Sequence, residues 1–160
     1  NIGIGQGYIS ATPIQLAHYT AALANKGIKK PLFLNNSLSG QMPSSEIELE
    51  NFNERDWSLL HKAMESVVES DYGTARRIRD QKDFLIAAKT GTGEIISLDS
   101  REEYERIRED QALRDHAIIV AFAPAEKPKY AVSVIIENGE SGGSIAGPVA
   151  LRILKELLKE

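Results

Sequence analysis

The residues best suited to chemistry lie in one short stretch, where the apolar residues 86–88 run into Lys89-Thr90-Gly91-Thr92. Because side chains alternate along a β-strand, we expect Thr90 and Thr92 to point the same way. Lys89 supplies a positive charge, and Gly91 has no side chain, so the backbone of a ligand could lie close to it. The stretch therefore predicts a strand edge that pairs with a peptide and holds an anionic group.

Lys-Thr-Gly is also one of three signature elements of the penicillin-binding proteins and serine β-lactamases, the others being Ser-x-x-Lys and Ser-x-Asn. Further stretches follow the order of that family: residues 5–13 (GQGYISATP), 16–17 (LA), 22–27 (ALANKG), 114–116 (RDH), 121–124 (AFAP) and 136–139 (IENG). On these residues the chain resembles the C-terminal part of the transpeptidase domain of a class B penicillin-binding protein. Within that class it is most similar to the elongation-type subfamily, penicillin-binding protein 2.

The resemblance implies acyl transfer through a serine ester. A serine would attack the penultimate D-Ala carbonyl of a peptidoglycan stem peptide, and an amine of a second stem would then take the acyl group. β-Lactams imitate D-Ala-D-Ala and leave the serine acylated. In this scheme Lys89 and Thr92 are catalytic, Lys89 through its positive potential and Thr92 through a backbone N–H that is one of two oxyanion-hole donors. Thr90, Gly91 and Thr92 bind the substrate, and we expect no cofactor and no metal.

Neither Ser-x-x-Lys nor Ser-x-Asn occurs in the 160 residues. We therefore expect residues 1–160 to be the C-terminal portion of a transpeptidase domain, with the nucleophile, its base and the second oxyanion donor upstream of Asn1. The 160 residues alone should be inactive. Removing the upstream part would expose apolar surface, which favours a dimer of the fragment.

The composition is that of a globular protein, with 42% hydrophobic and 26% charged residues. A net charge of -4 gives no basic footprint and argues against nucleic acid as a partner, and the absence of cysteine excludes disulfides and thiolate metal sites. No apolar run approaches the ~18 residues of a membrane helix, so we expect the fragment itself to be soluble. For the intact protein the resemblance implies a membrane anchor, a catalytic domain on the extracytoplasmic (periplasmic) side, and a membrane glycosyltransferase of the elongation machinery as partner.

Two longer helices and one short helix are predicted before the Lys-Thr-Gly stretch. The first begins at Pro13 after a Thr12–Gln15 capping box and ends near Gly27, with Leu16, Tyr19, Thr20 and Leu23 on its packed side. A short strand is expected at 32–34 and another at 47–49. Asn53 caps the second helix, whose apolar stripe is Trp57, Leu60, Met64, Val67 and Val68, with Trp57 as a core anchor. Thr74 is expected to cap a short helix that ends near residue 79.

The strand that carries Lys89 is predicted over residues 83–93, and an exposed helical excursion follows over residues 94–115. Residues 117–123 and 130–136 are near-continuous apolar strands joined by a short connection, which predicts an antiparallel hairpin with a central, doubly covered first strand. Residues 140–144 should form a flexible loop before a last helix with Ala150, Ile153, Leu154 and Leu157 on its buried stripe. This order of elements argues for an α+β fold, an antiparallel sheet with flanking helices that forms part of a penicillin-binding protein/serine β-lactamase-like fold.

Other interpretations remain open at this point. Asp115-His116 could be two members of a catalytic triad, but adjacent residues on a strand point to opposite faces. His18, His61 and His116 lack the spacing of metal ligands. A non-catalytic β-lactam-sensing or ligand-binding module of the same fold, a division-type transpeptidase, and a structural domain with a coincidental Lys-Thr-Gly are the alternative functions.

Overall fold

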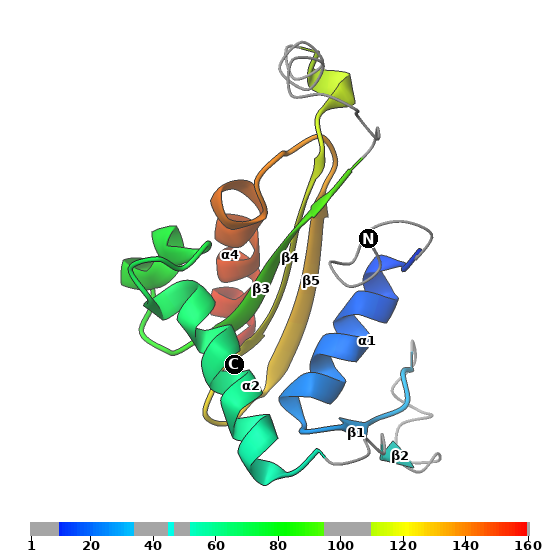
Figure 1. Ribbon diagram of the computed structural model, residues 1–160, viewed down its shortest axis with the longest axis vertical. Coiled ribbons are helices and arrows are strands. Elements are labelled where there is room, and N and C mark those ends of the chain that lie inside the picture. The colour runs from blue at the N-terminus through cyan, green and yellow to red at the C-terminus, as the bar shows by residue number, and fades with distance from the viewer. Residues whose placement is uncertain (1–9, 34–44, 47–51, 95–109, 160) are drawn as a thin grey trace.

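The computed structural model describes residues 10–33, 45–46, 52–94 and 110–159. Its centre is a three-stranded antiparallel sheet in the order β3 (Ala87–Gly93), β4 (His116–Ala123), β5 (Tyr130–Ile136). A separate antiparallel pair joins β1 (Ile28–Lys29) to β2 (Ser45–Glu46). Helices lie on both sides of the main sheet (Figure 1), so the predicted α+β class with an antiparallel sheet and flanking helices is confirmed.

The first helix, α1 (Pro13–Ala24), begins as its sequence predicts. The Thr12 hydroxyl accepts from the Gln15 N–H at 3.3 Å, and the Gln15 side chain accepts from the Thr12 N–H at 2.8 Å, which closes the capping box. Gly27 follows the helix with φ 89°, a conformation that glycine adopts without strain. Thr20 is buried as predicted and Leu23 packs against a core, but the prediction is wrong at Tyr19, which is 57% exposed. The other buried residues of the helix are Ala22 and Ala24.

The second helix, α2 (Glu54–Glu69), is capped by Asn53, whose side chain accepts from two backbone N–H groups of the first turn. Met64 and Val68 are buried, in agreement with the predicted stripe. Trp57 does not anchor the core: it is only partly buried, and its ring meets that of Phe52 edge-on at a centroid distance of 4.7 Å.

Each face of the main sheet carries its own hydrophobic core. The first core packs α4 (Gly147–Leu157), the end of α2 and the turns around them onto one face; its fully buried members include Val68, Ile78, Ile86, Ile119 and Leu154. The second core packs α1 and α2 onto the opposite face; its buried members are Ala24, Met64, Ala87, Phe122 and Ala125. Figure 1 shows α1 and α4 on opposite sides of the sheet.

The two apolar strands form the predicted hairpin. β4 pairs with both neighbours, so it is central as expected. Both of its faces are covered, because Ile119 enters the first core and Phe122 the second. In α4 the buried stripe is Gly147, Ala150, Leu151 and Leu154, whereas Ile153 is 39% exposed. The predicted stripe is therefore confirmed at Ala150 and Leu154, and at Leu157, which packs against the core, whereas Ile153 is wrong and Leu151 is buried in its place.

Several other expectations differ from the structure. No strand forms at residues 31–33, and the chain pairs earlier, at β1. β3 begins at Ala87 and not at residue 83. Most of the expected excursion and the strand expected at 47–49 lie outside the described residues; the described end of the excursion forms a short helix, η4 (Gln111–Leu113). Within the described residues, no helix has the length and apolar character needed to cross a membrane.

The core assignment of α4 predicts unequal costs for two neighbouring truncations. Leu154→Ala should lower the free energy of unfolding by about 2–5 kcal/mol, because it leaves a cavity in a site with 0% exposure. Ile153→Ala, on the exposed side of the same helix, should cost less than about 1.5 kcal/mol. Urea denaturation of the two variants measures both, and equal costs would contradict the assignment.

Candidate functional site at the edge of strand β3

β3 is an edge strand of the described sheet, because β4 is its partner and its other side has none. Its first residues, Ala87 and Ala88, are 0% exposed and enter one core each. After them the strand leaves the cores: Lys89 and Thr92 are exposed, and Thr90 and Gly91 are half-buried. The same strand is therefore an anchor at one end and an accessible polar edge at the other.

The backbone of β3 is accessible to a hydrogen-bonding group on the edge that faces away from β4. The Lys89 ammonium donates to the carbonyl oxygen of Thr90 at 2.8 Å. In an antiparallel ladder the N–H and C=O of one residue point to the same side of the strand, and those of the next residue point to the opposite side. Because a side chain reaches the Thr90 carbonyl, we expect the backbone groups of Thr90 to point away from β4. By the same alternation, we expect those of Thr92 to point away from β4 as well.

Thr74 reaches this edge from a distant part of the chain. Its hydroxyl oxygen lies 2.8 Å from the hydroxyl oxygen of Thr90, at hydrogen-bond distance. The short helix that follows, η3 (Arg76–Gln81), has Ala75 as its N-cap residue and no side-chain cap. The prediction that Thr74 caps this helix is wrong, because its side chain bonds to β3 instead.

The turn that carries Thr74 is packed against the end of α2. The Ala75 N–H donates to the Val67 carbonyl at 2.9 Å, and the Gly73 N–H donates to the Ser70 carbonyl at 2.9 Å. A Cβ on Gly73 would lie 2.4 Å from the Val67 carbonyl oxygen, which is shorter than any real contact of this kind. This position therefore requires glycine, and the glycine brings Thr74 close to the helix end.

An ion pair braces the same turn. Arg79 donates to Asp71 at 2.7 Å and to the Glu69 carbonyl at 3.1 Å. The hydrogen bond from Arg79, followed by its charge, lowers the pKa of the Asp71 carboxyl below its ordinary value, and the same bond raises the pKa of Arg79. Because the folded-state pKa of Asp71 is lowered, the stabilisation is present above the ordinary aspartate pKa and is lost as the pH falls through the lowered value. Asp71 is exposed and Arg79 is half-buried, so solvent screens the pair and its contribution is modest.

Two buried glycines support the site from the other side. The segment η5 (Gly142–Ala146) falls where the sequence predicts a flexible loop, yet Gly142 and Gly143 are buried. A Cβ on Gly142 would lie 2.2 Å from the Ile118 carbonyl oxygen and 2.7 Å from that of Gly91, and one on Gly143 would lie 1.8 Å from the Thr74 carbonyl oxygen. The loop prediction is therefore wrong, because the segment is in backbone contact with β3, β4 and the Thr74 turn.

A hollow of about 310 Å³ opens beside Lys89, between β3 and the end of α2. Hydroxyl-bearing residues and one ammonium dominate its lining, which consists of Ser66, Val67, Ser70, Tyr72, Gly73, Thr74 and Lys89. Tyr72 is 94% exposed at this hollow. The hollow therefore extends the accessible surface of the β3 edge towards Thr74.

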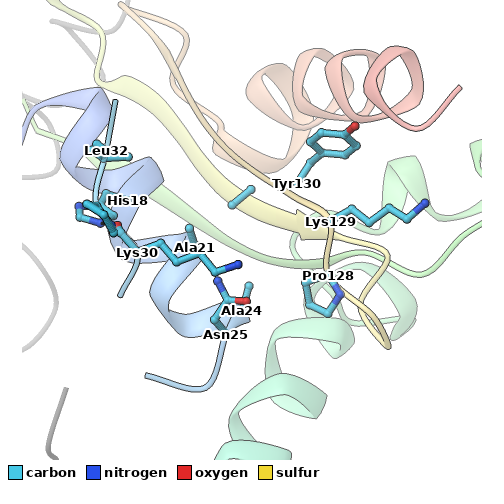
Figure 2. Close-up of a pocket in the computed structure, with 11 residues that line it drawn as sticks. His18, Ala21, Ala24, Asn25, Lys30, Leu32, Pro128, Lys129 and Tyr130 are labelled. Atoms are coloured by element: carbon cyan, nitrogen blue, oxygen red, sulfur yellow. Dashed lines mark hydrogen bonds between the residues drawn. The ribbon is translucent and has the colours of Figure 1, made fainter. Parts of the chain in front are cut away.

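A second hollow, of about 240 Å³, lies between α1 and the start of β5 (Figure 2). His18 is at its wall, and its Nε2 lies 2.6 Å from the Lys30 carbonyl oxygen. The β5 end of this hollow is on the edge of the sheet opposite to β3. It shares no lining residue with the hollow beside Lys89, so we do not include it in the site.

The remaining histidines are engaged in the fold. His61 Nε2 lies 2.8 Å from the Leu23 carbonyl oxygen, and its ring contacts Phe122 at a centroid distance of 5.1 Å. His116 Nδ1 accepts from the Asn138 N–H at 3.1 Å. Among residues 10–33, 45–46, 52–94 and 110–159, no group of three or more His, Asp or Glu side chains is placed to hold a metal ion.

Asn138 has a structural role that the sequence did not predict. It has φ 57°, and its side-chain amide donates to the Ala112 and Arg114 carbonyls at 2.9 and 3.0 Å. Asparagine tolerates this left-handed conformation better than most residues. These bonds join the turn after β5 to the segment that leads into β4. His116, the first residue of β4, pairs with Gly93 at the end of β3.

Comparison with known proteins places this architecture in a family. Residues 1–155 match the family described as "Penicillin binding protein transpeptidase domain". The chain is 32% identical, over its full length, to the peptidoglycan D,D-transpeptidase MrdA of Haemophilus influenzae, of which it covers 26%.

Solved structures agree with this match. The crystal structure of Pseudomonas aeruginosa PBP2 in complex with WCK 5153 superposes with a TM-score of 0.75 at 36% identity, covering 99% of this chain and 33% of that one. The complex between PBP2 and MreC from Helicobacter pylori gives a TM-score of 0.79 at 29% identity, covering 99% of this chain and 26% of that one.

The chain belongs to the penicillin-binding protein transpeptidase domain family. The similarity is to proteins of the PBP2 and MrdA type, as the resemblance predicted. The chain spans about a quarter of the length of the H. influenzae relative.

The glycine contacts at η5 predict a sharp difference between two neighbouring substitutions. Gly143→Ala should lower the free energy of unfolding by about 1–3 kcal/mol or more, because its Cβ has no room beside the Thr74 carbonyl. Gly147→Ala should be neutral or stabilise by up to ~1 kcal/mol, because its nearest neighbour would be 3.7 Å away and its backbone is already helical. Thermal or urea unfolding of the pair measures this, and a tolerated Gly143→Ala would show that the contact is not made.

Proposed function

We propose that the chain is the C-terminal portion of the transpeptidase domain of a bacterial, elongation-type peptidoglycan D,D-transpeptidase. In the intact protein a serine outside these 160 residues attacks the penultimate D-Ala carbonyl, the terminal D-Ala leaves as its amine, and an amine of a second stem peptide then displaces the serine from the ester. The observation that carries the proposal is the accessible, cationic, hydroxyl-bearing edge of β3 in a chain of the transpeptidase family.

The substrate carboxylate is held by Lys89, Thr90 and Thr92 in this proposal. Lys89 and Thr92 are exposed, and Thr90 is half-buried, with its side chain on the same face as that of Thr92. Two hydroxyl donors beside an ammonium match the terminal carboxylate of D-Ala-D-Ala and the carboxylate of a β-lactam. Gly91 between them leaves space for the substrate backbone to pair along the strand.

The backbone N–H of Thr92 is the oxyanion-hole donor that this chain contributes. The contact between Lys89 and the Thr90 carbonyl supports an outward direction for the backbone groups of residues 90 and 92. One such donor typically contributes about 3 kcal/mol of transition-state stabilisation. Lys89 adds positive potential beside the serine hydroxyl and so favours its deprotonation. The second donor and the general base come from the same upstream part as the serine.

The proposal also covers partners and location. The H. pylori relative forms a complex with MreC. We further propose that the intact protein works in a cell-wall elongation assembly, anchored in the cell membrane with the catalytic domain on the extracytoplasmic side; the MreC complex of the relative supports the assembly. Stem peptides, β-lactams and a membrane glycosyltransferase are then its partners.

Acylation of the intact protein by a fluorescent penicillin tests the function. The longer protein should form a covalent adduct, and the 160 residues alone should form none. Lys89→Ala in the longer protein should slow acylation by about 100-fold or more, because it removes the cation beside the carboxylate and the serine.

Lys129→Ala is the matched control, since it removes an exposed lysine at the start of β5, on the opposite edge of the sheet. It should leave the rate unchanged. Acylation that persists at the full rate without Lys89 would contradict the proposal. Acylation without crosslinking of stem peptides would indicate a β-lactam-sensing module instead.

A further inference from the structure

We infer that Thr74 is a positioning residue for this site: its hydroxyl holds the hydroxyl of Thr90 in the orientation that donates to the substrate carboxylate. The inference rests on the proposed function and extends it to a residue that lies 16 positions upstream on a separate turn. No property of the Lys-Thr-Gly stretch itself points to Thr74.

Which of the two hydroxyls donates decides whether the Thr90 proton is available to a substrate. Their oxygens are 2.8 Å apart, and either oxygen can be the donor in the free protein. A hydroxyl has one proton and two acceptor lone pairs. If Thr90 donates to Thr74, its proton is not available to a substrate. If Thr74 donates to Thr90, the proton of Thr90 is free to point at an anion.

An anion at the β3 edge selects the second arrangement. It accepts the Thr90 proton, and the Thr74 proton then bonds to the Thr90 oxygen, which forms a chain from Thr74 through Thr90 to the carboxylate. Hydrogen bonds in such a chain polarise one another, so the bond to the anion is strengthened. Water could supply a donor in place of Thr74, but it would not fix the χ1 angle of Thr90.

Thr74 is held firmly enough to act in this way. Its turn is fixed to the end of α2 by the Gly73 and Ala75 hydrogen bonds, each 2.9 Å long. On the other side its carbonyl touches η5, where only glycine fits at position 143. The neighbouring Gly142 is packed against the backbone of Gly91. The turn and the strand are therefore held in register by the same pair of glycines.

The test uses the intact protein and measures the second-order rate of acylation by a penicillin and by the same penicillin with its carboxylate esterified. Thr74→Val keeps the shape of the side chain and removes the hydroxyl. It should slow acylation by the free acid about three- to tenfold and leave the ester rate unchanged. The ratio of the two rates does not depend on the folded fraction, so a loss of folded protein alone would not change it.

Two further variants complete the experiment. Thr74→Ser restores the hydroxyl and should restore the acid-to-ester ratio. In a double-mutant cycle, Thr74→Val should have no further effect once Thr90→Val is present, because both act through the same hydroxyl.

The outcomes separate the two proposals. If the unaltered protein is not acylated at all, the proposed function fails and this inference fails with it. If the unaltered protein is acylated but Thr74→Val keeps the acid-to-ester ratio, the positioning role of Thr74 is overturned while the proposed function stands. Additive effects of Thr74→Val and Thr90→Val, or no rescue by Thr74→Ser, would overturn it equally.

Discussion

Within the part of the chain that the structure describes, β3 pairs with β4 on one side only, and this is the constraint on which the rest of the structure depends. A strand that is to bind a peptide must present free N–H and C=O groups, yet a free edge exposes the protein to pairing with the wrong partner. Here the free edge is short, and it carries a lysine and two glycines. The apolar anchor of the strand is confined to Ala87 and Ala88, which are completely buried.

Close backbone approach is the means by which the polar half of β3 is held in place. This half has no large apolar side chain with which to pack into a core. Glycines compensate for this, since Gly142 lies against Gly91 and Gly143 lies against Thr74. Contacts between backbone segments are stiff, because neither side has a rotamer that can change. Rigid support of this kind is what a site needs when its donors must be directed at a fixed position.

Elements with strong local signals could be predicted from the sequence. The capping box of α1, the Asn53 cap of α2 and the apolar hairpin of β4 and β5 each depend on residues that are near one another in the chain, and all three are present. The side chains that face a core were predicted less well. Tyr19, Trp57 and Ile153 are apolar residues at helical spacing, yet none of them belongs to either core, because spacing along a helix does not reveal which side the neighbouring elements cover.

The candidate site could be predicted only along β3. Lys89, Thr90, Gly91 and Thr92 are consecutive, so a motif can reveal them. Thr74, Gly142 and Gly143 join the site through tertiary contacts, and their local sequence indicates other roles, a helix cap and a flexible loop. From the sequence alone, the pair Gly142-Gly143 predicts a flexible loop. In the structure the same pair allows close packing against Gly91 and Thr74.

The central claim is that the outer edge of β3 binds the substrate. The most direct test is a crystal structure of the longer protein acylated by a β-lactam. The account predicts that the ligand lies along β3, with its carboxylate about 3 Å from the hydroxyls of Thr90 and Thr92 and its acyl oxygen facing the Thr92 N–H. A ligand bound away from β3, or a β3 edge that is paired with another strand of the protein, would contradict it.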